Sequence, residues 1–463
     1  MSATDRGGLE ASPALDIGWL EDRMSRLAWR PRDRVERVGR IEVLYSSVGP
    51  KRIVVLYRAA LRARGVTRHA LYTGIIVPPA KLAGLVRTLT RTARAAPIGR
   101  AVIPLPEAHA VLLAYPNDTA LRLPAGARTA RQLAARLLGR RRGGTRVVEA
   151  AFELLRYVPE RRWTARCRCV VTEGVGRRRA ATAIVKQFAR PERARRCYES
   201  LSALGPGPPA MATPRAAPPA GAPVRIARVL GFEAAAARVW IESLPGRTLE
   251  ERLGRIDLEP VMAGLGRSLA AFHRGRTALA RELTPEGERQ RIDEALEAIA
   301  AAFPDLERRL ARIAPGLGRA RDGGPPGVLH GSLRLNHVLV HRGRLAFVDL
   351  DGARMGPPAY DLANLLASLY YLESEERITR DVRTRTMRCV MDGYTSIASR
   401  QIPPRTLLGF VADLLVAKQA VKYATRLRRD RRTRLERMLD LAEQFVSLAR
   451  RPPAGSRAWS ALP

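Results

Sequence analysis

Lysine is scarce in this strongly basic chain. Only five of the 81 basic residues are lysines, and the formal net charge is +37. Such an excess normally raises the question of a nucleic-acid or membrane partner. The arginines, however, are scattered along the chain rather than gathered in one tract, and alanine, glycine and proline are abundant, as GC-rich codons would give. We therefore expect a solvated arginine-rich surface that attracts anionic substrates, and nucleic-acid binding is the less favoured alternative.

Cysteines and long apolar runs are also few. The four cysteines, among them Cys167 and Cys169 on one face of a predicted strand, are too poorly spaced for a zinc site. We expect buried thiols in a reducing compartment. No apolar run approaches the length of a membrane span, and the N-terminus has acidic residues before any basic cluster and no hydrophobic signal region. The sequence therefore predicts a cytoplasmic protein.

A chain of 463 residues with 46% hydrophobic residues is long enough for two or three domains. β-rich patterns occupy the first half, and helical spacing of apolar residues dominates the second. The predicted parts are an N-terminal extension with one helix, a degenerate β-rich lobe, a second β-rich lobe that binds nucleotide, a mostly helical catalytic lobe, and a flexible tail. Their expected ranges are 1–37, 38–140, 146–246, 247–450 and 451–463.

The two β-rich lobes look like copies of each other. Thr73–Ile76 matches Thr182–Val185, and Lys51-Arg52 matches Arg161-Arg162, at an offset of 109 to 111 residues. A steady offset over several elements favours an internal duplication over two unrelated hairpins made alike by strand chemistry. In this alignment Val77 of the first copy occupies the position of Lys186 in the second, so the first copy is expected not to bind nucleotide in this way.

The most informative stretch runs from 328 to 372. His330-Gly331 begins a loop, two short apolar runs joined at Arg342-Gly343 follow, and the second run ends in Asp349-Leu350-Asp351. A helix is expected to begin near Tyr360-Asp361. Two strands joined by a tight turn place the loop before them and the acidic residue after them at one edge. That arrangement suits side chains that converge on a metal and a phosphate.

This stretch resembles the catalytic segment of the aminoglycoside phosphotransferase and choline kinase families, relatives of the protein kinases. Their pattern is H-G-D-x-x-x-x-N, then I-D-[FWL]-[DE], then D-x-A-Y-D-[LI]-A. Ser332 stands where these families have the catalytic aspartate, and His337 stands where they have the metal-binding asparagine, with Asn336 one place early. The matching residues are His330, Gly331, Asp349, Asp351, Tyr360, Asp361, Leu362 and Ala363.

The resemblance implies an α+β, bilobal, protein-kinase-like fold whose N-terminal β-rich lobe is duplicated, and it implies ATP and Mg²⁺ as cofactors. Lys186 would bind the phosphates, with Glu199 as its partner; the alternative is an ordinary surface lysine. Glu242 lies in the strand 239–243, whose backbone would meet the adenine edge. Asp349 would bind the metal, and Asp351 would be a second ligand or orient the loop.

The catalytic loop itself would be formed by Ser332, Asn336 and His337. His330 would pack the loop, and Asp361 would anchor its backbone. A serine cannot take a proton near neutral pH as a carboxylate can, and general-base assistance is worth about 10²- to 10⁴-fold. The sequence therefore predicts an ATP-dependent phosphotransferase acting weakly on a hydroxyl of a small molecule. The alternative is a pseudokinase, a nucleotide-binding or scaffold protein whose duplicated lobe contacts a protein partner.

Overall fold

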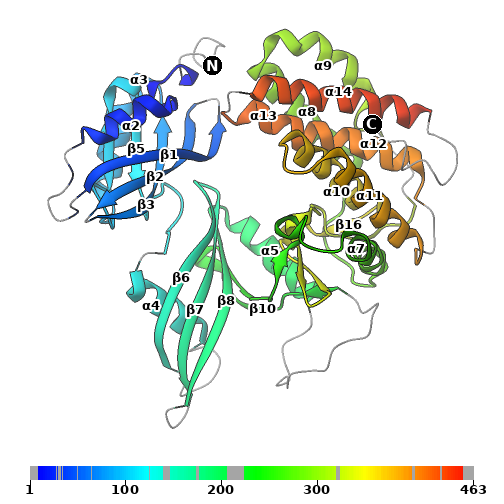
Figure 1. Ribbon diagram of the computed structural model, residues 1–463, viewed down its shortest axis with the longest axis horizontal. Helices are drawn as coiled ribbons and strands as arrows, with labels where there is room; N and C mark the ends of the chain where they lie inside the picture. Colours follow the sequence, from blue (N-terminus) through cyan, green and yellow to red (C-terminus); the bar gives the residue numbers. More distant parts are fainter. Residues whose placement is uncertain are drawn as a thin grey trace. The chain divides into compact units, whose positions relative to one another are not determined.

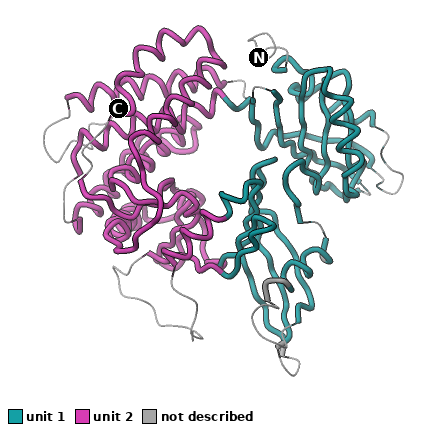
Figure 2. The backbone as a smooth tube through the Cα atoms, turned by 180° about the vertical axis from the view of Figure 1, so that it is seen from behind, with its two compact units in different colours: residues 1–194, 230–241, 425–427 teal, residues 195–229, 242–424, 428–463 magenta. Residues whose placement is uncertain are grey.

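The computed structural model describes residues 9–27, 29, 33, 35–49, 51–63, 65–124, 126–138, 146–173, 177–205, 224–319, 324–398, 402–427 and 430–451. Residues 174–176 and 206–223, and all of the predicted tail 451–463 except residue 451, lie outside them. The chain divides into two compact units (Figure 2). Unit 1 comprises 1–194, 230–241 and 425–427, and unit 2 comprises 195–229, 242–424 and 428–463.

Unit 1 begins with a short 3-10 helix, Pro13–Leu15, and helix α2 (Ile17–Ser25). Asp16 caps α2, since its carboxylate accepts hydrogen bonds from the N–H groups of Gly18 and Trp19. Leu20 and Met24, on the apolar face that the sequence predicted, are fully buried against the first sheet.

The first sheet has five strands in the order β1-β2-β3-β5-β4 (Figure 1). Helix α3 (Pro79–Thr92) follows β3 and packs Leu82, Leu85, Val86 and Leu89 on one face, while α2 covers the other. Strand β2 is buried almost continuously, because Leu56 on its other face packs in a cluster shared with the second sheet. The strands are β1 (Val35–Val48), β2 (Ile53–Ala63), β3 (Val66–Ile76), β4 (Val102–Leu105) and β5 (Ala110–Ala114).

The second sheet repeats this plan. Its order, read from the first strand, is β6-β7-β8-β11-β10. This is the order of the first sheet, with β6, β7, β8, β10 and β11 in the places of β1, β2, β3, β4 and β5. Helix α4 (Gly126–Leu138) connects the two sheets, and α5 (Pro191–Leu204) follows β8 as α3 follows β3. The strands are β6 (Arg146–Val158), β7 (Arg162–Glu173), β8 (Arg177–Phe188), β10 (Val229–Glu233) and β11 (Arg238–Glu242).

Backbone details repeat as well. In each sheet a 3-10 turn connects the last two strands in chain order, β4 to β5 and β10 to β11. Each turn ends in a residue with a left-handed conformation: His109 (φ 49°) in the first sheet and Ala237 (φ 47°) in the second. The carbonyls of these residues accept hydrogen bonds from the N–H groups of Val77 and Phe188, both at 3.0 Å. The predicted fold class is therefore confirmed, including the repeated β-rich lobe.

This register corrects one detail of the sequence alignment. Because Val77 corresponds to Phe188, the first-lobe counterpart of Lys186 is Ile75, not Val77. Ile75 is fully buried in the core beneath α3. The first lobe still has an apolar residue where the second has its lysine.

The first lobe holds the turn between β6 and β7. Asp118 accepts hydrogen bonds from the Tyr157 hydroxyl (2.6 Å) and from the N–H of Glu160 (2.9 Å). Glu160 is left-handed (φ 59°), and its carboxylate pairs with Arg52 at 2.7 Å. Thr119 donates to the same carboxylate. The turn between β6 and β7 is thus fixed by side chains of the first lobe.

Unit 2 is mostly helical. Helix α10 forms its centre, and nearly every side chain of α10 is buried. No helix in the described part of the chain is long and apolar enough to cross a membrane. The helices are α6 (Leu249–Arg252), α7 (Leu258–His273), α8 (Pro285–Ala302), α9 (Glu307–Ile313), α10 (Ala359–Ser374), α11 (Arg380–Thr395), α12 (Pro404–Leu414), a π-helical segment (Leu415–Ala420), α13 (Val421–Thr425) and α14 (Arg431–Arg450).

Candidate functional site

Two small antiparallel pairs support the predicted catalytic segment. Strand β14 (Val338–His341) pairs with β15 (Arg344–Phe347), and β13 (Gly327–Leu329) pairs with β16 (Arg354–Gly356). Arg342 and Gly343 both have positive φ, 48° and 71°, as a two-residue hairpin turn requires. The hairpin brings the loop before β14 and the acidic segment after β15 to the same edge, as the sequence predicted.

Asp361, at the start of α10, fixes the backbone of this loop. Its buried carboxylate accepts hydrogen bonds from the N–H groups of His330 (2.6 Å) and Gly331 (2.8 Å). His273 Nε2 lies 3.2 Å from the same carboxylate, and His273 Nδ1 lies 2.9 Å from the Tyr394 hydroxyl. Burial alone would raise the pKa of Asp361, but the hydrogen bond and charge of His273 and the contacts with His330 outweigh it, and the pKa is lowered. Asp361 is therefore an ionised anchor.

Gly331 lets the loop approach the acidic segment closely. Its φ is 74°, and a Cβ atom built there would lie 2.0 Å from the carbonyl oxygen of Gly352. Any other residue would strain the backbone and separate the two segments. The contact places the predicted catalytic position, Ser332, beside the residues that follow β15.

Ser332 is partly buried and contacts a histidine. His330 Nε2 lies 3.0 Å from the carbonyl oxygen of Val348, so this nitrogen carries the hydrogen and donates it. His330 Nδ1 is then an acceptor, and the Ser332 hydroxyl lies 3.5 Å from it. Burial lowers the pKa of His330, and its ring stacks on His337 at 5.5 Å. His330 thus packs the loop as a neutral ring.

His337 is poorly arranged for a metal. Arg334 Nη2 lies 2.9 Å from His337 Nε2, and because a guanidinium only donates, that nitrogen is the acceptor. The same nitrogen is the one that faces Asp349, at 3.4 Å from Oδ2. Its lone pair is therefore already used, and imidazole suits Mg²⁺ poorly in any case.

Oxygen atoms of the kind that bind Mg²⁺ come from three residues near His337: Asn336, Asp349 and Asp351. Asp349 is left-handed (φ 62°, ψ 42°) and partly exposed, and Asp351 follows in a 3-10 turn. Asn336 Oδ1 is buried without a hydrogen-bond partner among the described residues. Those residues include no group of three or more His, Cys, Asp or Glu that could hold a metal ion. One or two carboxylates, completed by substrate phosphates and water, are the usual Mg²⁺ site at a nucleotide, so these residues fit that metal.

The predicted nucleotide-binding residues are divided between the units. Lys186, on β8 of unit 1, is buried, with 7% of its surface exposed, which disagrees with the alternative of a surface lysine. Glu199 is exposed on α5 and belongs to unit 2, so its pairing with Lys186 remains a prediction.

Glu242, at the end of β11, is bound by two arginines. Arg225 lies 2.7 Å and Arg228 3.3 Å from its carboxylate. Burial opposes ionisation, but the hydrogen bonds and charge of these arginines lower the pKa of Glu242. Its N–H donates to the Arg228 carbonyl at 2.9 Å, so this backbone donor is not available to an adenine edge.

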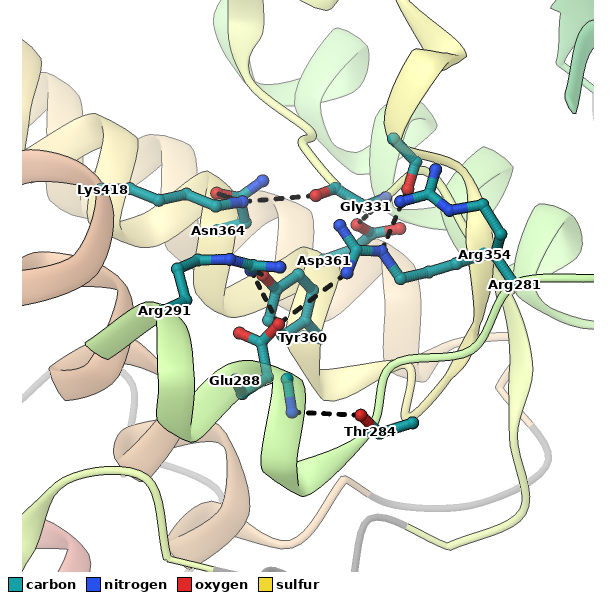
Figure 3. A network of polar contacts seen from close by, with 12 residues as sticks. Arg281, Thr284, Glu288, Arg291, Gly331, Arg354, Tyr360, Asp361, Asn364 and Lys418 are labelled. Carbon is teal, nitrogen blue, oxygen red and sulfur yellow. Dashed lines mark hydrogen bonds and ion pairs between the residues drawn. The ribbon is translucent and has the colours of Figure 1, made fainter. Parts of the chain in front are cut away.

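Sequence reasoning missed a group of cations beside the loop. Arg281 precedes α8, Arg291 lies on α8, Arg354 lies on β16, and Lys418 lies in the π-helical segment. Figure 3 shows that Arg291, Arg354 and Lys418 extend toward Tyr360, and that Arg281 is directed to the Asp351 carbonyl. They come from four separate elements, so no local motif marks them. The available signal was the rarity of lysine, since Lys418 is one of only five.

No curated protein sequence matches the chain. A choline kinase from Streptococcus pneumoniae is 14% identical (TM-score 0.41), over 69% of this chain and 99% of that one. A choline/ethanolamine kinase family protein from Mesorhizobium loti is 13% identical (TM-score 0.39), over 67% and 92%. A putative aminoglycoside phosphotransferase from Ralstonia eutropha is 13% identical (TM-score 0.39), over 70% and 98%. The family model described as "Phosphotransferase enzyme family" matches residues 163–398, about half of the chain, and the protein therefore belongs to that family.

Proposed function

We propose that the protein is an ATP-dependent phosphotransferase that acts on a hydroxyl group of a small molecule. The observation that carries the proposal is the anchored loop. Asp361 fixes the backbone at His330 and Gly331, so that Ser332 lies next to the segment that contains Asp349. Phosphoryl transfer needs little covalent work from a protein beyond such positioning and charge stabilisation.

In the reaction, the bond between the γ-phosphorus and the β–γ bridging oxygen of ATP breaks, and a bond forms to the acceptor oxygen. ADP leaves, and the hydroxyl proton passes to solvent. When bound, Mg²⁺ neutralises charge on the β- and γ-phosphates. Asp349 and Asp351 would hold it, with Asn336 Oδ1 as an additional oxygen, and Lys186 would bind the phosphates.

Ser332 positions the acceptor hydroxyl without serving as a strong base. Its own O–H is directed to His330 Nδ1, which leaves an oxygen lone pair to accept the hydrogen bond of the acceptor. The missing carboxylate costs about 10²- to 10⁴-fold in rate, or roughly 3 to 5 kcal/mol. We therefore expect slow transfer.

A pseudokinase is the second candidate. Two observations favour it: the serine at the aspartate position, and the β6–β7 turn held by Asp118 and Arg52 of the first lobe. In this case the protein binds nucleotide without transferring phosphate, and the first lobe is the surface that contacts a protein partner.

A titration with ATP and Mg²⁺ followed by thermal unfolding tests nucleotide binding, with Asp349→Ala as the variant that removes the metal ligand. The expected result is a rise in Tm that Asp349→Ala abolishes. ADP release over a panel of hydroxyl compounds then separates the candidates. Ser332→Asp raises turnover at least tenfold if the site is an impaired phosphotransferase. A rise in Tm without turnover in either protein supports the pseudokinase, and no rise in Tm contradicts both.

A further inference from the structure

Positive charge is concentrated around one aromatic ring next to the catalytic loop. The Lys418 ammonium lies 5.2 Å from the centre of the Tyr360 ring, and the Arg354 guanidinium lies 5.9 Å from it. Arg291 donates a hydrogen bond to the Tyr360 hydroxyl at 2.8 Å. Figure 3 shows that these three side chains extend toward the ring from different elements.

The cluster has fewer negative groups than positive ones. Glu288 is the buried carboxylate within it, 2.7 Å from Arg291 and 3.8 Å from Arg354. Burial, together with the charges of Arg291, Arg354 and Arg334, lowers the pKa of Lys418 to about 7 against the opposing effect of Glu288. Nearby Asp361 is already engaged with two N–H groups and His273.

The Arg281 guanidinium lies in a similar environment of burial and neighbouring positive charge. Burial lowers its pKa, and the charges of Arg354, Arg196 and Arg291 lower it further. Partly buried cations that repel one another are unfavourable unless an anion lies among them. The arrangement therefore has the electrostatic character of an anion site.

Two further features connect the cluster to a ligand. Asn364 is 1% exposed, its Oδ1 lies 3.2 Å from Lys418 Nζ, and its Nδ2 has no acceptor among the described residues. Lys418 itself lies in a π-helical segment, a geometry found frequently at functional sites. A buried amide donor that has no acceptor among the described residues thus lies next to the Lys418 ammonium.

The cluster also adjoins the reacting position. Lys418 Nζ donates a hydrogen bond to the carbonyl of Gly331 at 3.2 Å, and Gly331 directly precedes Ser332. Arg281 donates to the carbonyl of Asp351 at 3.2 Å. A small molecule whose hydroxyl lies at Ser332 would therefore place a nearby substituent among these cations.

We propose that these residues form an anion-binding subsite for the acceptor, which is a small hydroxyl compound with a carboxylate or phosphate group. The proposal rests on the proposed phosphotransferase function and adds the class of acceptor. Arg291, Arg354 and Lys418 bind the anionic group, with Asn364 as an additional donor. An acceptor whose substituents are amines meets like charge at this position and is disfavoured.

Sulfate binding tests the subsite without requiring turnover. The Tm is measured at pH 6.5 against sodium sulfate, with sodium chloride holding the ionic strength constant. A saturable rise is expected, weakened at least tenfold in apparent affinity by Lys418→Met or Arg291→Gln. Lys422→Met is the matched control, since Lys422 lies one turn away, is also partly buried, and lies over Tyr371 instead. Equal effects of Lys418→Met and Lys422→Met, or no saturable rise in the unaltered protein, overturn the proposal.

Two more variants sharpen the result. Glu288→Gln removes the opposing charge and is expected to tighten sulfate binding about tenfold. Lys186→Met is expected to leave the sulfate affinity unchanged. If Lys186→Met abolishes sulfate binding, the anion binds at the nucleotide site, and the subsite proposal is overturned. Competition by glycerate and by glycerol 3-phosphate, with glycerol as the uncharged reference, then distinguishes a carboxylate from a phosphate group. Failure of both anions to compete better than glycerol contradicts the acceptor class.

The ATP–Mg²⁺ titration is run in parallel, so the two proposals fail separately. If sulfate binding depends on Lys418 but the protein does not respond to ATP and Mg²⁺, the anion site is supported and the phosphotransferase function is contradicted. The anion can then no longer be assigned to an acceptor. A response to ATP and Mg²⁺ without Lys418-dependent sulfate binding retains the phosphotransferase and removes the subsite.

Discussion

Replacing Asp361 by asparagine should destabilise unit 2 measurably. The substitution preserves shape but removes the charge that receives two N–H groups and faces His273. An asparagine carbonyl replaces one acceptor, while its NH₂ group faces a donor. Loss of a hydrogen bond to a charged group costs about 1.5–3 kcal/mol. We expect the free energy of unfolding to fall by about 3 kcal/mol.

Urea unfolding at pH 7 measures this change, and Asp381→Asn is the control. Asp381 pairs with Arg385 at 2.9 Å on the exposed face of α11, with 69% of its side chain exposed, and exposed pairs contribute about 0–1 kcal/mol. A change below about 1 kcal/mol for Asp361→Asn, or equal changes in both variants, would refute the anchoring role.

The pH dependence gives a second check on Asp361. Its folded-state pKa is lower than the ordinary value of 3.8. The unfolded chain therefore takes up the proton first as the pH falls, and the stabilisation is complete above about 3.8 and decreases below it. The difference between the unaltered protein and Asp361→Asn should shrink over that acidic range. A difference that stays constant or grows would show that the carboxylate is not ionised in the folded protein.

Three other substitutions have defined outcomes. Gly331→Ala should lower the free energy of unfolding by at least about 2 kcal/mol in urea, because alanine is strained at this positive φ and its Cβ would lie only 2.0 Å from the Gly352 carbonyl oxygen; a neutral result would contradict the close approach. Glu160→Gly should be more stable than Glu160→Ala by about 1 kcal/mol, since both lose the pair with Arg52 and only alanine is strained at φ 59°. With a folded pKa of about 7 against 10.5 unfolded, Lys418 should make stability rise from about pH 7 to 10.5, because only the unfolded chain then keeps the proton. Lys418→Met should remove this rise of the free energy of unfolding with pH, as measured by urea unfolding at several pH values. An unchanged pH dependence would contradict the lowered pKa of Lys418.

The sequence predicted what depends on local pattern. Alternating apolar residues identified the two sheets, and the predicted hairpin after Ser332, with its turn at Arg342-Gly343, agrees closely with the structure. The roles expected of His330 and Asp361 in packing and anchoring the loop also agree with the observed contacts. Motif spacing was sufficient here because each of these features is determined by residues close together in the chain.

Features determined by distant residues were missed or misaligned. The alignment of Lys186 with Val77 instead of Ile75 is an error of two residues. Because strand side chains alternate between faces with a period of two, such a shift keeps each side chain on the same face, and the apolar pattern cannot detect it. The hydrogen bonds at His109 and Ala237 reveal it. The arginines that occupy Glu242, and the cations around Tyr360, come from separate elements and could be found only once the chain was folded.

The shared core of unit 1 limits how this protein can be divided. Trp163 and Trp240 of the second sheet are packed in one cluster with Leu56, Tyr45 and Leu71 of the first. A fragment that begins at β6 would contain the whole family match, yet it would leave those tryptophans facing water and the β6–β7 turn without Asp118. Expression of the family-matching half alone should therefore yield an aggregating product, and tests of the proposed nucleotide binding should keep both lobes on one polypeptide.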